Sequence, residues 1–324
     1  MSANLISAPN SFFVSALLKQ CVKSIALPLV GFAIFLLLWE FGSSKVQTSL
    51  GQFPGPAIVF NQVQGLYQEY KEDKASRAAF YERQEKRFAE ARAQDPNYVA
   101  EHRQYSGKPT FIQQIFTSLK TVFTGFLLAS LIAIPLGIAV GLSANLYAAI
   151  NPLIQLFKPI SPLAWLPLVT IVVSAVYSNP DGVPKSFITS SMTVMLCSLW
   201  PTLINTAVGV TSVSSDLINV SRVLRLNWLR HVRSIVLPSA VPMIFTGLRL
   251  SLGIAWMVLI AAEMLAQNPG LGKFVWDEFQ NGSSDSLGRI MVAVLTIGVI
   301  GYLLDRGMLL LQKVFSWDKQ AILR

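Results

Sequence analysis

The chain has 324 residues, of which 52% are hydrophobic and only 13% are charged. Soluble domains average about 25% charged residues, so this composition excludes a set of soluble domains and indicates a chain that lies mostly in lipid. Lys and Arg number 26 against 17 Asp and Glu, and this excess fits basic cytoplasmic loops better than a nucleic-acid surface. Two Cys and two His are too few for a disulfide framework or a metal cluster, so no metal site is expected.

The first predicted element is a transmembrane helix over residues 25–42. Its apolar run approaches the length that crosses the hydrocarbon core, about 20 residues. No small-residue cleavage pattern follows Glu40, so we interpret the run as an uncleaved span rather than a signal peptide. Residues 1–24, which include Lys19 and Lys23, are predicted to be cytoplasmic.

The next segment, residues 43–113, is predicted to be an extracytoplasmic helical insertion. A turn at Pro54-Gly55-Pro56 precedes a stretch of dense mixed charge with apolar residues at helical spacing. This pattern predicts an exposed helix or helical hairpin over 57–94, broken at Asp95-Pro96. Two roles remain open for the insertion: packing on the protein or a neighbour, and a part in substrate binding.

Residues 114–312 are predicted to form a five-helix core, and residues 313–324 a cytoplasmic tail. With the first span, this gives an all-α polytopic membrane protein of about six transmembrane helices. If the N-terminus is cytoplasmic, six spans place the basic loop at 214–238 and the basic tail on that same side. The core spans are expected near 116–142, 161–177, 187–210, 239–266 and 290–311, with a polar break at 143–151.

The loop at 214–238 is predicted to contain two short basic amphipathic helices. Ser215 and Asp216 are good N-caps for the first, over 217–226. Asn227 can cap the second, which we expect to end at Leu237-Pro238. A membrane protein with no energy source of its own could use such a loop to receive force from a soluble partner.

This loop keeps the spacing of a known pattern: Glu-Ala-Ala, three residues, Gly, nine residues, then Ile-x-Leu-Pro. Ile235, Leu237 and Pro238 match the end of the pattern. The triplet falls on Asn219-Val220-Ser221 and the Gly position on Arg225, so the spacing is kept while those identities differ. Further stretches that carry a resemblance are 54–56, 118–121, 159–167, 222–226, 246–253, 261–264 and 272–277.

Together these stretches resemble the permease subunits of type I ATP-binding cassette importers, in the branch that imports nitrate, sulfonates, taurine and bicarbonate. Residues 222–226 and 272–277 look most like nitrate permeases. The resemblance implies a non-catalytic subunit of the bacterial inner membrane, with both termini cytoplasmic, that passes nitrate or nitrite inward. Bicarbonate, taurine or another sulfonate is the alternative substrate. The alternative transport mechanism is that of an ion-coupled secondary transporter.

The resemblance also implies partners. In that family a cassette ATPase binds ATP and Mg²⁺ and grips the coupling helix, and a substrate-binding protein delivers the cargo. The chain has no Gly-x-x-x-x-Gly-Lys-Ser/Thr motif, so no cofactor of its own is expected. A second copy and membrane lipid are also expected as partners, and nucleic acid is not. The residues predicted to couple to the ATPase are Leu217, Asn219, Val220, Ser221, Arg222, Leu224, Arg225, Trp228, Leu237 and Pro238; a basic helix lying on the membrane surface is the alternative.

Four residues are candidates for the translocation pathway: Arg249, Ser190, Thr193 and Lys120. Arg249 lies deep in its span, where it could attract an anion or bond to helix carbonyls. The hydroxyls of Ser190 and Thr193 could line a weak site or hold helices together. Lys120 could draw anions to the mouth or merely extend its ammonium to water.

Three residues are candidates for docking the binding protein or for a gate: Glu263, Trp276 and Asp277. Glu263 would repel an anion if unpaired, so it is expected to contact a cation or the binding protein. Trp276 and Asp277 belong to a short amphipathic helix between the last two spans, which could equally be an interfacial anchor. Paired carboxylates at mid-membrane, which an ion-coupled transporter would need, are not visible in the sequence.

Overall fold

The computed structural model describes residues 11–48, 51–95, 99, 102–178 and 182–315, with side chains from residue 26 onward. The all-α prediction is confirmed, since the described strands are only the antiparallel pair β1 (Gln47–Thr48) and β2 (Gly51–Gln52). Five described helices are long and apolar enough to cross a membrane, or six if one bent helix pair counts as a single span. The side chains of Lys19 and Lys23 and the tail from residue 316 lie outside the described residues.

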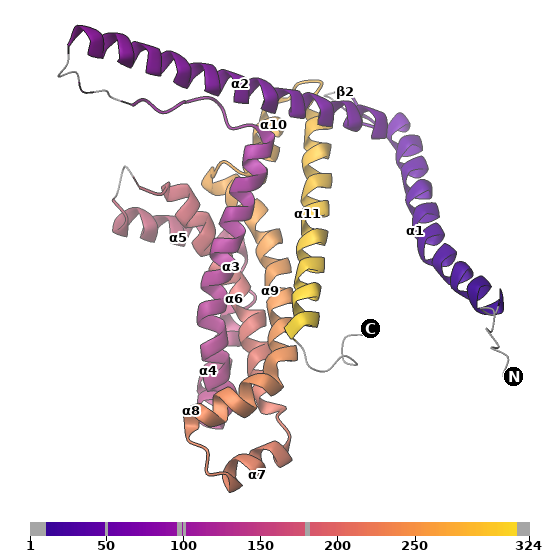
Figure 1. Cartoon of the computed structure of the whole chain (residues 1–324), viewed down its shortest axis with the longest axis vertical. Helices are drawn as coiled ribbons and strands as arrows, with labels where there is room; N and C mark the ends of the chain where they lie inside the picture. The colour runs from indigo at the N-terminus through magenta and orange to yellow at the C-terminus, as the bar shows by residue number, and fades with distance from the viewer. Residues whose placement is uncertain (1–10, 49–50, 96–98, 100–101, 179–181, 316–324) are drawn as a thin grey trace, which may run out of the picture.

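The first two helices stand apart from the bundle (Figure 1). α1 (Ser11–Lys45) splays away from it, and α2 (Pro56–Gln94) lies across one end of it as one continuous helix, not a hairpin. The indole N–H of Trp39 donates to the carbonyl of Pro54 at 3.1 Å, which fixes the corner between them. Val59 and Leu66 of α2 are buried against the bundle, so its near half is packed while its far half extends beyond.

Three helices form the centre of the bundle: α3 (Phe111–Leu142), α6 (Lys185–Thr211) and α9 (Leu237–Ala266). Small residues let α3 and α6 approach closely. A Cβ added at Gly125 would lie 2.6 Å from the carbonyl oxygen of Ser191, too near for any side chain. Close contact through small residues is how helices associate in lipid, where the solvent gives no hydrophobic driving force. α11 (Ser286–Phe315) packs on α9 and beneath α2.

The predicted third span is different from its expected form. Residues 162–176 make only the short helix α5 (Pro162–Val176), which is bent by 100° from a preceding helix, α4 (Ala144–Phe157). The polar break expected at 143–151 is wrong, because Ser143 caps α4 by accepting a hydrogen bond from the amide of Leu146 at 3.3 Å. The bend comes after Phe157, where closely spaced prolines remove backbone donors.

The loop between α6 and α9 contains α7 (Ser215–Val223), α8 (Trp228–His231) and η1 (Val232–Val236), a π-helical turn. The prediction that the second helix ends at Pro238 is wrong, because α8, η1 and α9 form one uninterrupted helix over 228–266. Pro238 lies in the first turn of α9, just after the amide of Leu237 bonds to the carbonyl of Val232 five residues back. α10 (Leu271–Asn281) lies at the opposite end, beside α2 (Figure 1).

Candidate coupling site

α7 lies in a loop at one end of the molecule, far from α2 (Figure 1). Its N-cap is Ser214, whose hydroxyl accepts from the amide of Leu217 at 3.5 Å. The predicted caps Ser215 and Asp216 are thus displaced by one or two positions into the first turn, where the Asp216 carboxylate still favours the helix dipole.

The C-terminus of α7 ends in a Schellman motif. The amide of Leu226 donates to the carbonyl of Ser221, and the amide of Arg225 to that of Arg222, both at 3.1 Å. Arg225 has φ 48°, in the left-handed region. This is the position at which the sequence pattern carries Gly, and the backbone explains that preference, because left-handed φ costs a residue with a Cβ about 1 kcal/mol.

One side-chain contact joins α7 to α8. The hydroxyl of Ser221 lies 2.7 Å from Nδ1 of His231, and Ser221 is only 6% exposed. Ser221 was predicted to face the ATPase, but it faces inward toward His231. The sequence analysis missed this pair. The only available signal was that Ser221 and His231 are polar residues on either side of the turn that joins α7 to α8.

The outward surface of this loop is apolar with a basic rim. Leu224 and Trp228 are 62% and 61% exposed, and Arg222 and Arg225 are exposed beside them. An apolar helix face rimmed by charge suits insertion into a partner's groove. The other exposed members of the predicted set are Leu217, Asn219, Val220 and Pro238, while Leu237 is half-buried.

The four candidate pathway residues are not brought together. Ser190 and Thr193 are fully buried between helices, and their hydroxyls donate to the carbonyls of Ala262 at 3.5 Å and Thr189 at 2.9 Å. Ser190 thus bonds α6 to α9, whereas Thr193 bonds within α6, and neither hydroxyl lines an open space. Lys120 is exposed, with its ammonium 5.3 Å from the ring centre of Phe187.

Arg249 has a partner that the sequence did not reveal. Its guanidinium donates to both carboxylate oxygens of Asp305 on α11, at 2.5 and 2.9 Å. The two side chains are 42% and 40% exposed, so the pair lies at the surface of α9 and α11 rather than in a pathway through this chain. Arg249 was expected either to attract an anion or to bond to helix carbonyls. It instead forms an ion pair, as charged residues within transmembrane helices commonly do.

Glu263 is fully buried, so it does not present a docking contact in this structure. The Ser118 hydroxyl lies 2.9 and 2.8 Å from its two carboxylate oxygens, and the amide of Gly272 donates to one of them at 3.1 Å. A Cβ at Gly270 would lie 2.1 Å from this carboxylate, which explains the glycine. Glu263 therefore joins α3, α9 and the start of α10, with hydroxyl and amide partners instead of the expected cation.

The other two docking candidates lie on α10 and are half-buried. Asp277 forms an ion pair with Lys273 at 2.7 Å, and the ring of Trp276 packs beside that of Phe279 at 5.8 Å. A docking or gating role for them stays a prediction.

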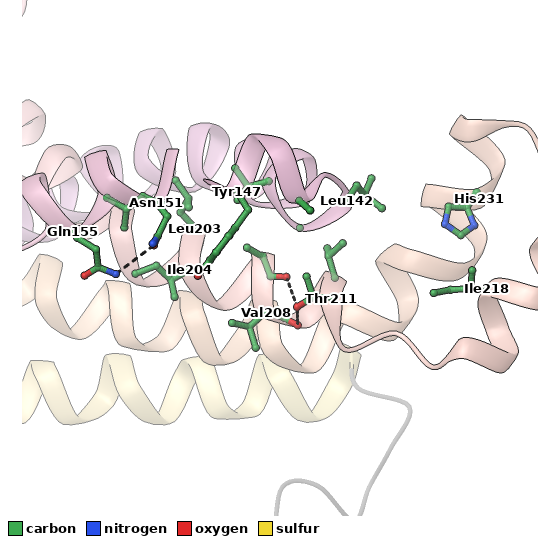
Figure 2. Close-up of a pocket in the computed structure, with 16 residues that line it drawn as sticks. Leu142, Tyr147, Asn151, Gln155, Leu203, Ile204, Val208, Thr211, Ile218 and His231 are labelled. Atoms are coloured by element: carbon green, nitrogen blue, oxygen red, sulfur yellow. Dashed lines mark hydrogen bonds between the residues drawn. The ribbon is translucent and has the colours of Figure 1, made fainter. Parts of the chain in front are cut away.

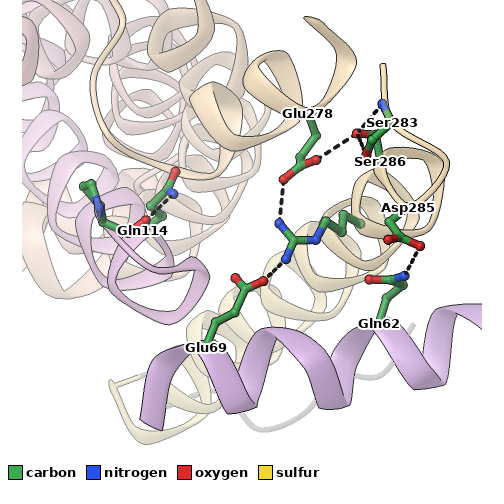
Figure 3. Close-up of polar contacts among 9 residues, drawn as sticks. Gln62, Glu69, Gln114, Glu278, Ser283, Asp285 and Ser286 are labelled. Carbon is green, nitrogen blue, oxygen red and sulfur yellow. Dashed lines mark hydrogen bonds and ion pairs between the residues drawn. The ribbon is translucent and has the colours of Figure 1, made fainter. Parts of the chain in front are cut away.

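A second polar network fastens the far end of α10 to α2 (Figure 3). Arg289 of α11 pairs with Glu278 of α10 at 2.9 Å and also with Glu69 of α2. Glu278 is buried and accepts a hydrogen bond from Ser286 at 3.0 Å. Sequence reasoning missed this network, because its members are up to 220 residues apart.

Comparison with known proteins identifies the family of this chain. A family model described as binding-protein-dependent transport system inner membrane component matches residues 133–316. The chain belongs to this family of importer permeases. The match contains α4 to α11 and the whole α7–α8 loop, whereas α1 and α2 lie outside it.

Two relatives of this permease illustrate the branch. The bicarbonate transport system permease protein CmpB of Synechococcus elongatus is 36% identical over 91% of both chains. The nitrate import permease protein NrtB of a Synechocystis species is 40% identical over 60% of this chain and 66% of the relative. Among solved structures, an inward-facing MetNI methionine ABC transporter has the same fold, with a TM-score of 0.53 and 15% identity over 66% of this chain and 96% of that one.

Proposed function

We propose that the chain is the non-catalytic membrane subunit of an importer that passes a small anion inward, with nitrate or nitrite as the cargo. The observation that carries this proposal is the α7–α8 loop, whose apolar face and basic rim are exposed in the part of the chain that the structure describes. A 40% identical relative named as a nitrate import permease supports the choice of anion.

The energy comes from separate cassette ATPase subunits, which bind ATP and Mg²⁺ and receive α7 in a groove. A substrate-binding protein delivers the anion at the α2 end. A second copy completes the pathway, since oligomers of this kind are usually two-fold symmetric. The face between α5 and α6 suits that second copy, because it holds an open cavity of about 440 Å³ whose lining is almost entirely apolar.

The proposed orientation places both termini and α7 in the cytoplasm of a bacterial cell and α2 outside its inner membrane. Basic residues concentrated in the α7–α8 loop support this assignment. The loop 43–113 is long enough to be translocated whatever its charge.

Force reaches the outer side through one continuous helix. A push on α7 passes to α8 through the contact between Ser221 and His231, and then along residues 228–266 as a single rod. Near the far end of this rod, Glu263 holds the start of α10. Tilting the rod therefore moves α10 at the proposed mouth in the same step.

Bicarbonate is the second candidate cargo. The bicarbonate relative aligns over 91% of this chain, a longer match than the nitrate relative gives. Taurine and other sulfonates follow from the resemblance of the branch alone.

Uptake by the complete complex tests the proposal. The chain is reconstituted in vesicles with candidate cassette ATPases and a candidate binding protein from the same organism, and uptake of labelled nitrate, bicarbonate and taurine is measured with and without ATP. We expect ATP-dependent nitrate uptake. Uptake of bicarbonate or taurine alone would reassign the cargo, and uptake driven by an ion gradient without ATP would refute the ABC mechanism.

A further inference from the structure

The near half of α2 carries apolar side chains that the bundle does not cover. Val59 and Leu66 are buried against the bundle, whereas Phe60, Val63 and Tyr67 are 63%, 45% and 51% exposed. An exposed apolar surface of this kind usually marks a contact with another apolar phase.

These three side chains form one stripe along α2. At about 100° of helix rotation per residue, Phe60, Val63 and Tyr67 lie within about 60° of one another, beside the buried face that carries Leu66. The opposite flank of that face carries Glu69, which pairs with a cation of α11. The stripe therefore continues the packed face of α2 sideways, past the edge of the bundle.

The side of α2 that is turned away from the bundle is polar. Asn61, Gln64 and Gln68 are exposed there, at positions opposite the buried face. A helix with a polar outer face and an apolar, aromatic side is suited to lie in the plane of a membrane surface.

Two spans fix the level of α2 relative to the bilayer. The first span ends at Lys45 and leads into α2 through the corner where Trp39 donates to Pro54. At the start of the last span, α11, the amide of Gln62 donates to Asp285 at 3.1 Å. A helix of 30 residues, as α11 is, is about 45 Å long, whereas the hydrocarbon core is about 30 Å thick, so its ends lie among the headgroups. Because α2 lies across this end of the bundle (Figure 1), it runs along the bilayer surface.

Two lysines follow the stripe toward the far half of α2. Lys71 and Lys74 are exposed, and their positions on the helix continue the line of Val63 and Tyr67. The ammonium group of Lys71 lies 4.6 Å from the ring centre of Tyr67. Aromatic rings at headgroup level, with lysines that reach the phosphates of anionic lipids, are typical of segments at a membrane surface.

The stripe differs from the apolar side chains at the α7 end, which face a cavity. There Leu203 and Ile204 line a cavity of about 690 Å³ between α4 and α6 (Figure 2). Phe60, Val63 and Tyr67 lie at the opposite end of the molecule, on its outer surface. Their apolar neighbour therefore lies outside the described chain.

We propose that the near half of α2 lies in the bilayer surface, with Phe60, Val63 and Tyr67 among the lipid acyl chains and with Lys71 and Lys74 at phospholipid phosphates. The lipid surface then holds the α2 end of the bundle at a fixed level. This inference goes beyond the proposed function, because it depends neither on the cargo nor on the side of the membrane on which α2 lies.

Spin labels test the lipid contact in the complete complex. A nitroxide is attached to Phe60→Cys or to Tyr67→Cys in a chain whose native cysteines are replaced by serine, and the complex is reconstituted without binding protein in vesicles of phosphatidylcholine and phosphatidylglycerol. The collision rates of each nitroxide with oxygen, which concentrates in lipid, and with a water-soluble nickel chelate are measured. We expect the ratio of oxygen to nickel collisions to be several-fold higher than at control positions, because the stripe lies about 5–10 Å into the headgroup boundary.

Gln64→Cys and Gln68→Cys are the matched controls, because both positions are exposed on the polar outer face of the same helix. Equal ratios at the stripe and at the control positions would place the stripe in water and overturn the proposal. Low collision rates with both probes at the stripe would show that protein covers it. With the binding protein left out, that result would assign the stripe to another subunit, such as the second copy, and would also overturn the proposal.

Charge reversal tests the lysines. Lys71→Glu with Lys74→Glu should lower the ratio at the Tyr67→Cys label toward the value at the control positions, because carboxylates are repelled by anionic lipid. Arg83→Glu with Lys86→Glu, exposed on the far half of α2, is the matched control and should leave the ratio unchanged. An equal change in both double variants, or no change in either, would overturn the contact of the lysines with phosphates.

Discussion

At one end of α9 the carboxylate of Glu263 is fully buried and bonded to α3 and α10, whereas at the other end α8 meets α7 through the contact between Ser221 and His231. The α2 end is enclosed by hydrogen-bond networks in which the buried carboxylates of Glu263 and Glu278 have several partners. The second end exposes large apolar side chains, including Trp228. The α2 end, which we call the frame, is therefore joined by buried hydrogen bonds, whereas the α7 end presents the exposed surface that we propose receives the ATPase.

The largest expected effect comes from charging the exposed loop. Leu224→Asp with Trp228→Asp places carboxylates where apolar contacts with the ATPase would form, while both side chains are mostly exposed in the chain itself. Uptake should be almost abolished while the melting temperature in detergent stays unchanged. Leu224→Met with Trp228→Phe is the control, and near-normal uptake by the charged variant would disprove groove docking.

The next effect is expected at the frame. Glu263→Ala leaves the Ser118 hydroxyl and the Gly272 amide without their acceptor in a buried site, at a cost of about 3 kcal/mol. Thermal unfolding in detergent should show a clearly lower midpoint. Glu82→Ala, on the exposed part of α2, is the control. If both variants lowered the unfolding midpoint equally, the structural role of Glu263 would be disproved.

A smaller loss is expected at the junction of α2 with the frame. Arg289→Met removes the cation from buried Glu278, and because Ser286 still donates to that carboxylate we expect a cost of about 2 kcal/mol. The same unfolding measurement applies, with protease sensitivity of α2 as a second readout. Arg92→Met, on the far half of α2, is the control and should change neither the unfolding midpoint nor the protease sensitivity. If Arg289→Met also changed neither, the Arg289 network would not be what fastens α2 to α10.

The smallest effect has the opposite sign. Arg225→Gly relieves the left-handed backbone at φ 48° and should stabilise the turn by up to about 1 kcal/mol, less the added chain entropy of glycine. Hydrogen exchange of the Leu226 amide, which donates to Ser221, should slow. Arg222→Gly, inside α7, is the control and should speed the exchange of this amide. If both glycine variants changed the exchange rate in the same direction, the left-handed φ of Arg225 would not be the cause.

Much of the architecture could be predicted from the sequence because apolar length and charge are local signals. The spans, the loop at 214–238 and the helical insertion all follow from such patterns. Helix α4 could not be predicted, since residues 143–151 have the composition of a loop while Ser143 caps the helix and Asn151 lies within it. Which prolines end a helix and which, like Pro238, are tolerated in a first turn also depends on the surrounding backbone.

The site was harder to predict than the fold, because its key contacts join residues far apart in the chain. Arg249 and Asp305 are 56 residues apart, and Glu263 and Ser118 are 145 apart. Arg249 and Glu263 are isolated charges in apolar runs, which reveals that each has a partner but not which residue it is. The two helices of the loop at 214–238 could be predicted because their signals are contiguous, but the caps of the first, the continuation of the second past Pro238 and the inward turn of Ser221 were missed.

The π-helical turn at Val232–Val236 has one more consequence for anyone who edits this protein. Such a turn accommodates one residue more than an α-helical turn does. Deleting a single residue there would restore regular bonding and keep α8 near its present direction, whereas a deletion within the regular part of α9 would rotate α8 by roughly 100°. The π-helical turn is therefore the place in residues 228–266 where one residue can be removed with the least change in the direction of the Trp228 indole.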